Sequence, residues 1–201
     1  MAISKTFIAR LALSALGNKS RIENVDTENS VEAKECKLWY DFAREEALEA
    51  FDWSFARKRA TLAEHSVDPP EEWAYRYQYP ADCLAMRFIE NPAGPTADPV
   101  PYIVEDASDG TPSILANLDS AVAVYTFNQQ NTTRFSRHFC RTMAYFLARD
   151  IAIALTGKRT LRDDMVAAAA TMIVGASAQN SNERQDPKPR DAEYIRAREG
   201  L

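Results

Sequence analysis

The hydrophobic pattern of this chain changes its period twice, and this change restricts the fold more than any other feature of the sequence. Up to about residue 52, apolar residues recur every three or four positions, as they do on one face of a helix. Over residues 57–127 the clearest stretches alternate between apolar and polar residues, which is typical of half-buried strands. The helical period returns at about residue 133. The pattern predicts an α+β fold that is mainly an α-helical bundle, with a small antiparallel β-sheet inserted between its second and third long helices and an extended C-terminal arm.

Four helices are expected from the positions of the apolar residues and of the capping residues. Asn29 is placed to cap the second helix, with Glu32 at the reciprocal position of a capping box. Gly157 is placed to end the third helix, because glycine readily adopts the left-handed conformation found at helix ends. The expected helices cover about residues 4–16, 30–52, 133–156 and 160–177.

Large aromatic residues occupy every second position at the start of the expected sheet. These are Trp73, Tyr75, Tyr77 and Tyr79. Four aromatic side chains on one face of a strand favour core packing. A platform for stacked nucleic-acid bases would carry more interleaved basic residues than Arg76 alone. Further strands are expected at residues 84–88, 102–104 and 121–127, with a turn at Asp109-Gly110.

The second helix carries two apolar faces, whereas a simple surface helix needs one. The broader face is expected to point into the bundle. The narrower face consists of Val31, Leu38 and Phe42, which we call the α2 stripe. It has two interpretations: it lies under the inserted sheet, or it contacts a neighbouring subunit. The small size of most exposed apolar patches favours the first interpretation, and the second makes these residues a candidate inter-subunit stripe.

The C-terminal part of the chain loses the hydrophobic pattern. Residues 1–178 are expected to form a single domain, and residues 179–201 an extended arm rich in polar residues and proline. The arm ends in a cluster that pairs an aromatic and an aliphatic residue with two guanidinium groups, a combination enriched at interfaces. The candidate contacts to a partner protein or to another subunit are therefore Tyr194, Ile195, Arg196 and Arg198.

Composition and motifs indicate no catalytic, cofactor or metal site. The net charge of −5 argues against a dedicated nucleic-acid binder. The three cysteines form no CxxC pair, and His65 and His138 lie far apart without a zinc-binding pattern. No apolar run is long enough to span a membrane, and the N-terminus lacks the pattern of a signal peptide. The basic run at residues 57–59 is more readily explained by structural ion pairs than by phosphate binding.

Three carboxylates require comment. Glu45 and Glu46 are adjacent on a helix, so their side chains point about 100° apart, which suits a solvated face better than the facing carboxylates of a glycosidase. Asp150 falls within the apolar arc of the third long helix, where a lone charge is costly. An ion pair, a hydrogen bond to a tyrosine or a subunit interface explains Asp150 more simply than catalysis.

Several segments, taken in order, resemble the head-to-tail adaptor proteins of short-tailed bacteriophages, the family of tail tubular protein A. Their motifs are packing motifs, individually weak, and their order makes the resemblance fairly specific. The segments are Leu13-Ser14-Ala15-Leu16-Gly17, Trp53-Ser54-Phe55-Ala56-Arg57-Lys58-Arg59-Ala60-Thr61-Leu62-Ala63, Tyr79-Pro80-Ala81-Asp82-Cys83-Leu84, and Tyr125 followed by Phe139, Ala144, Leu147 and Ala148.

The resemblance implies a structural virion protein and not an enzyme. Members of the family form a ring, generally a dodecamer, between the capsid portal and the tail nozzle, and the ring leaves a channel for double-stranded DNA. The implied partners are further copies of the chain, the portal protein, a tail nozzle or tube protein, and DNA that passes without sequence-specific binding. The implied location is the virion, after synthesis in the bacterial cytoplasm. Two alternatives stay open: a peptidoglycan hydrolase of the tail, and a head-completion ring protein of a longer-tailed phage.

Overall fold

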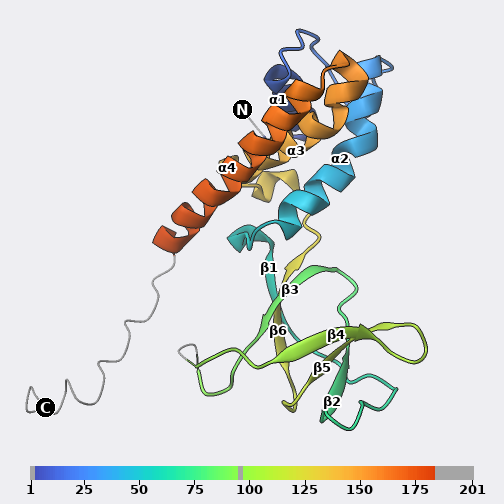
Figure 1. Ribbon diagram of the computed structural model, residues 1–201, viewed down its shortest axis with the longest axis vertical. Helices are drawn as coiled ribbons and strands as arrows, with labels where there is room; N and C mark the ends of the chain where they lie inside the picture. The colour runs from blue at the N-terminus through green and yellow to red at the C-terminus, as the bar shows by residue number, and fades with distance from the viewer. Residues whose placement is uncertain (1–2, 95–96, 184–201) are drawn as a thin grey trace, which may run out of the picture.

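The computed structural model describes residues 3–94 and 97–183 and shows a helical bundle above a β-structure (Figure 1). The third long helix is central to the bundle, because the other three pack chiefly against it. Two short 3-10 turns, η1 and η2, lead out of and back into the bundle. The helical elements are α1 (Lys5–Ala15), α2 (Val31–Glu49), η1 (Ser54–Ala56), η2 (Thr132–Arg134), α3 (Arg137–Thr156) and α4 (Arg159–Glu183).

The strands form two antiparallel sheets of three strands each. The first sheet has the order β1-β6-β3 and the second the order β2-β5-β4. A turn was predicted at Asp109-Gly110, and it joins β4 to β5 as a hairpin. The strands are β1 (Arg57–Thr61), β2 (Tyr75–Gln78), β3 (Cys83–Ile89), β4 (Tyr102–Asp106), β5 (Pro112–Ala116) and β6 (Val122–Phe127).

Two isolated bridges join the sheets at their corners. Glu64 bridges to Tyr77, so the chain after β1 continues beside β2. Ile89 bridges to Val100, so the end of β3 lies beside the segment that leads to β4. The sheets therefore enclose one core between them, as in a small barrel. Its buried members are Leu62, Tyr77, Ile89, Ile114, Ala116, Ala121, Ala123 and Tyr125.

The predicted fold class is wrong in its β-part. One small sheet was expected, and two three-stranded sheets are present, all of whose strands precede α3 and α4. Alternation along a strand reports which face is buried and carries no information on the partner strand. The alternating pattern also did not predict β1 and β5. Strand β1 is mostly charged, and β5 is a short continuous apolar run, so neither alternates.

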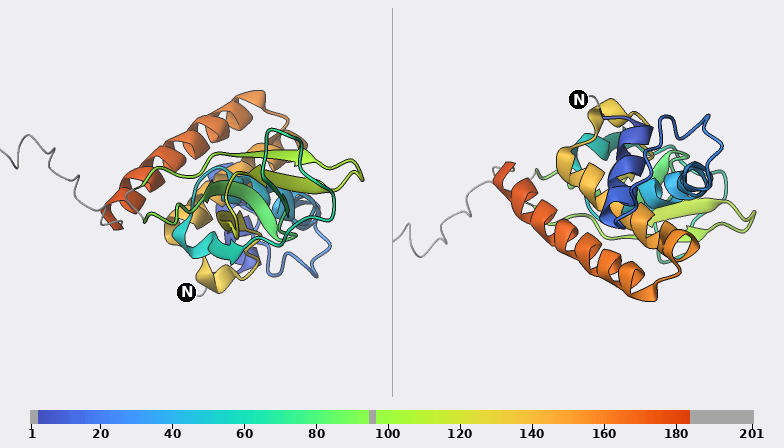
Figure 2. Two further views of the ribbon diagram at one scale, coloured as in Figure 1. Left: turned by 90° about the horizontal axis from the view of Figure 1, so that it is seen from below. Right: turned by 90° about the horizontal axis from the view of Figure 1, so that it is seen from above.

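The predicted C-terminal boundary is wrong as well. The arm was expected to begin at residue 179, but α4 continues to Glu183. Residues 179–183 are polar yet include no proline or glycine, and the backbone hydrogen bonds of a helix are satisfied internally, so such residues can extend an exposed helix. The C-terminal end of α4 projects beyond the rest of the bundle (Figures 1 and 2).

The helix ends follow the capping rules with one shift of register. Ser30, and not Asn29, caps α2, and its hydroxyl accepts a hydrogen bond from the amide of Ala33. Glu32 accepts a hydrogen bond from the Ser20 hydroxyl. Gly157 ends α3 in the left-handed conformation, with φ of 67°, as predicted.

Arg87 of β3 connects the barrel to the bundle. Its Nη2 donates to the carbonyl oxygens of Leu48, Glu49 and Phe51, at 3.2, 3.0 and 2.9 Å. Its Nε donates to the hydroxyl of Thr126 on β6, at 2.8 Å. A cation at these carbonyls satisfies acceptors that the end of a helix leaves unpaired.

Trp53 fills the other side of the same junction. Its ring is buried and packs edge-on against Phe51 and Phe139, with ring centroids 5.1 and 5.3 Å apart. Its indole N–H donates to the carbonyl oxygen of Ala47, at 2.7 Å. Trp53 thus lies buried where the helical bundle meets the barrel.

Candidate functional site

The α2 stripe lies on the surface of the bundle. The exposed fractions of Val31, Leu38 and Phe42 are 65%, 70% and 58%. The ring of Trp39 meets Phe42 edge-on, with centroids 6.0 Å apart, so one half-buried aromatic residue supports the stripe from the side. The first interpretation, in which the stripe lies under the inserted sheet, is therefore wrong.

The opposite face of α2 explains why the stripe stays outside. Small and medium side chains on that face pack into the bundle and bring α2 close to α3. The rotation of the helix is thereby fixed, and Val31, Leu38 and Phe42 point away from the core. The buried apolar residues of α2 are Ala33, Cys36, Tyr40, Ala43, Ala47 and Leu48.

A second apolar face lies on α4. Val166 and Val174 are 46% and 72% exposed, and the exposed Ala170 lies between them one turn from each. The other side of α4 packs against α3 through Met165 and Ala169. The sequence predicted the inward face of α4 and gave no indication of the outward one, because alanines leave a helix nearly apolar all round. We call Val166, Ala170 and Val174 the α4 face.

The adjacent carboxylates of α2 are bound in separate ion pairs. Glu46 receives two hydrogen bonds from Arg149 of α3, at 2.7 and 2.6 Å. Glu45 accepts from Arg44 at 3.0 Å and from the side-chain amide of Asn128 at 2.9 Å. Two carboxylates held by different partners do not form the facing pair that glycoside hydrolysis requires.

Asp150 completes the ion cluster at Arg149. Its carboxylate accepts from the Arg149 Nε at 2.8 Å, which confirms the predicted ion pair. Burial raises the pKa of Asp150, and the guanidinium of Arg149 opposes that shift. The cluster joins α2 to α3 and is structural.

The basic run at residues 57–59 is likewise paired. The guanidinium of Arg57 meets Asp52, the ammonium of Lys58 lies 2.7 Å from Asp82, and Arg59 lies 2.6 Å from Glu90. Because all three cations are already paired with carboxylates, none of them is free to bind a phosphate.

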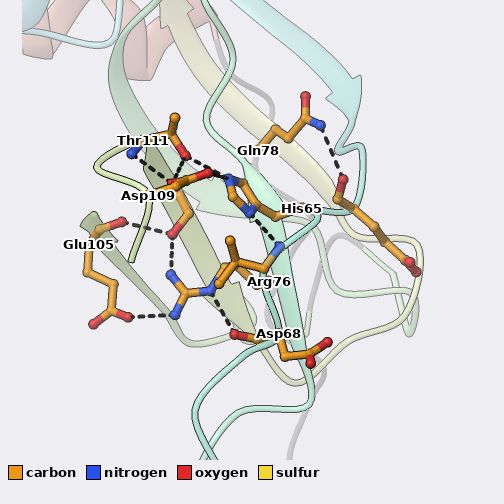
Figure 3. A network of polar contacts seen from close by, with 10 residues as sticks. His65, Asp68, Arg76, Gln78, Glu105, Asp109 and Thr111 are labelled. Atoms are coloured by element: carbon orange, nitrogen blue, oxygen red, sulfur yellow. Dashed lines mark hydrogen bonds and ion pairs between the residues drawn. The ribbon is translucent and has the colours of Figure 1, made fainter. Parts of the chain in front are cut away.

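The most connected polar cluster lies on the outer side of the barrel (Figure 3). Arg76 of β2 is buried, and its guanidinium donates to Ser113 at 2.7 Å, to Glu105 at 3.1 Å and to the carbonyl oxygen of Asp68 at 3.3 Å. These bonds tie β2, β5, β4 and the loop before β2 together.

His65, Thr111 and Asp109 lie beside this cluster in an order that superficially resembles a catalytic triad. The Nδ1 of His65 accepts from the amide of Val67 at 3.0 Å, so the ring proton sits on Nε2. The Nε2 therefore donates to the Thr111 hydroxyl at 2.8 Å, and that hydroxyl donates to Asp109 at 2.6 Å. A nucleophile needs a base that takes its proton, and here the histidine gives one. The arrangement holds the β4–β5 turn.

A groove of about 640 Å³ opens beside β3, and its charges are already engaged. Arg59 and Glu90 in its wall are paired with each other, Asp52 is paired with Arg57, and Arg87 binds the end of α2. The groove offers no free charged group among these residues for a ligand.

The remaining sequence candidates are structural or lie outside the described residues. Tyr77 is fully buried, with Tyr75 and Tyr79 packed at the edge of the barrel core, which confirms the predicted packing role for these three residues. Trp73 lies before β2, is half-buried and is not part of that core. Burial raises the pKa of the Cys36 thiol to about 12 and that of Cys140 to about 11, so neither is a reactive thiolate. Tyr194, Ile195, Arg196 and Arg198 fall outside the described residues.

Within the described part of the chain, no cluster of histidine, cysteine or acidic residues is suited to a metal ion. No helix there has the length and apolarity needed to cross a membrane. No protein-family model and no curated protein matches the sequence. The candidate functional site is therefore the α2 stripe, together with the α4 face.

Proposed function

We propose that this chain is a structural subunit of a ring, the head-to-tail adaptor of a short-tailed bacteriophage. In this role it joins the capsid portal to the tail nozzle in the virion and surrounds the path of the DNA. The observation that carries the proposal is the exposure of the α2 stripe, three large apolar side chains without a partner in the described part of the chain.

Two different apolar faces on one molecule suit a ring better than a two-fold dimer. A two-fold interface uses the same patch twice, whereas a ring pairs one patch with a different patch of the next copy. The α2 stripe and the α4 face are different surfaces on helices that both pack against α3. Contact between the stripe of one copy and the α4 face of the next repeats around a ring.

The size of the contact predicts how assembly depends on the portal. Burying the exposed parts of three such side chains contributes about 3–6 kcal/mol. Association costs about 4–15 kcal/mol in lost translational and rotational freedom. We therefore expect a monomer or a mixture at low concentration, and a defined ring when a portal holds the copies side by side.

The chemistry of the described surface is compatible with a structural role. Glu45, Glu46 and residues 57–59 are engaged in ion pairs within the chain. An acidic chain with a net charge of −5 does not grip passing DNA strongly. The hydrolase alternative has no observation in its favour.

The test is assembly on the portal protein encoded by the same genome. Sedimentation and class-average images of the full chain are expected to give a defined ring with the portal and a smaller species without it. Leu38→Asp and Phe42→Asp are expected to abolish the ring, because each places a charge in the apolar contact. Ala93→Asp, which adds the same charge at an exposed loop position of the barrel, is the control.

A stable dimer that is unchanged by the portal contradicts the proposal. Full assembly of both stripe variants contradicts the role assigned to the α2 stripe. Each variant is first shown to have the thermal midpoint of the wild type, which separates lost assembly from lost folding.

A further inference from the structure

The strand β4 is an edge strand of its sheet, and the bridge between Ile89 and Val100 joins this edge to β3 just before Tyr102. The amide of Ala107 donates to the carbonyl oxygen of Thr111, and the register pairs Glu105 with Ser113 and Ile103 with Leu115. Backbone groups alternate in direction along an antiparallel strand. The N–H and C=O groups of Tyr102, Val104 and Asp106 therefore point away from β5, toward the open edge.

The other edges of the two sheets are protected. The edge of β1 carries Arg57, Lys58 and Arg59, and charged residues of this kind discourage strand addition. The edge of β3 is irregular, with two shifts of register against β6. The edge of β2 is covered by the chain at residues 63–65. In contrast, β4 keeps a continuous register over its whole length and contains no lysine or proline.

The side chains of β4 give the edge a definite chemistry. Ile103 and Val104 are 48% and 46% exposed, one on each face of the strand. Glu105 and Asp106 follow, and Asp109 lies in the adjoining turn, so the edge is apolar at one end and acidic at the other. A matching strand that runs parallel to β4 is apolar at its start and basic at its end.

Residues 193–198 of this chain have that pattern. Tyr194, Arg196 and Arg198 fall on one side of an extended segment, and Ile195 and Ala197 on the other. In a parallel alignment Tyr194 lies opposite Ile103, Ile195 opposite Val104, and Arg196 opposite Glu105. Each such cross-strand pair is favourable.

The geometry favours a neighbouring copy as the donor of this segment. The C-terminal end of α4 and the β4–β5 hairpin lie on opposite sides of the molecule in every view (Figures 1 and 2). The ten residues between Glu183 and Tyr194 span at most about 33–36 Å when extended. A donor at one side and an acceptor at the other side match the head-to-tail contacts of a ring.

We propose that the edge of β4 receives residues 193–198 of the neighbouring copy as an added strand. The inference deepens the proposed ring, since it rests on copies standing side by side. Backbone hydrogen bonds to Tyr102, Val104 and Asp106 provide the attachment, and the acidic end of β4 orients the two arginines.

The first test is a cross-link in the full chain. Ile195 is replaced by a photoreactive benzoylphenylalanine, and light-isotope and heavy-isotope chains are mixed on the portal before irradiation. Light-to-heavy cross-links to residues 102–106 are expected. Cross-links that stay within one chain, or that fall elsewhere on the neighbour, overturn the inference.

Two variants and a control sharpen the result. Val104→Pro removes an outward N–H that β5 does not use, and Glu105→Gln removes the charge that lies opposite Arg196. Each is expected to lower the intermolecular cross-link about ten-fold. Asp164→Asn makes the same change of charge on the exposed surface of α4 and is expected to leave the yield unchanged. An unchanged yield in Glu105→Gln overturns the inference even where Val104→Pro fails to fold.

A peptide assay separates this inference from the ring itself. A labelled peptide of residues 190–201 is titrated with the full-length Leu38→Asp protein, in which the ring contact is removed. Binding that is weakened by Glu105→Gln supports the β4 edge even where no ring is seen. Rings that assemble while neither the peptide nor the cross-link reaches β4 overturn this inference and leave the proposed function intact.

Discussion

The helical bundle and the barrel differ in how they treat their outer surfaces. The bundle leaves large apolar side chains of the α2 stripe and the α4 face in solvent. The barrel covers its outer side with ion pairs and hydrogen bonds around Arg76 and leaves open backbone groups along β4. The bundle thus offers non-directional apolar contact, and the barrel offers directional hydrogen bonding. The two regions are suited to different steps of one assembly.

The largest expected effect is at the junction between the two regions. Trp53→Ala is expected to destabilise the fold by about 3–5 kcal/mol, the usual cost of truncating a buried large aromatic residue. Urea unfolding measures the change, with the half-buried Trp73→Ala as the matched control in the barrel. A loss below about 1 kcal/mol contradicts the buried position of Trp53.

Arg87→Met tests whether bundle and barrel unfold together. Hydrogen bonds from a charged group contribute about 1.5–3 kcal/mol, and Arg87 contacts Leu48, Glu49 and Phe51. We expect the free energy of unfolding to fall by about 2–3 kcal/mol. We also expect tryptophan fluorescence and far-ultraviolet dichroism to report separate unfolding transitions. Arg87→Lys keeps the charge and is expected to lose less. Coincident transitions in Arg87→Met contradict the coupling role.

Asp150→Asn tests the ion cluster inside the bundle through its pH dependence. Burial raises the pKa of Asp150, so the folded protein binds this proton more tightly than the unfolded chain. The folded state therefore loses stability from this group as the pH rises above about 4, the unperturbed value for aspartate. Asn cannot titrate, so the variant is expected to have a flatter stability profile between about pH 4 and pH 7. If the stability of the variant depends on pH in the same way as that of the wild type, Asp150 is not the source of this pH dependence.

Removal of the residues beyond Glu183 has the smallest expected effect on folding. The described bundle and barrel cores lie wholly before that point. The shortened chain is expected to keep its thermal midpoint within about 3 °C and to lose retention on the portal. A large fall of the midpoint means that the removed segment packs on its own copy, and full portal binding contradicts the docking role.

The sequence predicted the elements with strong local signals and missed those fixed by distant partners. The first three helices were placed near their observed bounds, and Gly157 ends α3 as expected, whereas α4 continues past its expected end at residue 177 to Glu183. The division into two sheets was missed, because it depends on pairings such as Lys58 with Tyr125, far apart along the chain. Arg87 was missed because a single arginine in a strand gives no sign that it binds the end of a helix.

For the α2 stripe, the sequence placed three residues on one helix face and favoured the wrong environment for that face. The spacing of Val31, Leu38 and Phe42 placed them on one face of α2, and that spacing is local. Whether the face is covered depends on where the barrel sits relative to α2. That position is set by Trp53 and Arg87 at the junction. The open edge of β4 was likewise hidden until the strand order was known.

The position of Arg87 also determines how mechanical load passes through the molecule. Its guanidinium connects the last turn of α2 to Thr126, and Thr126 lies on β6, the middle strand of its sheet. A pull on α2 therefore reaches a strand that is held on both sides by antiparallel neighbours. Force along such a strand is shared by many backbone hydrogen bonds at once. A force on the bundle is therefore not expected to open the barrel one bond at a time.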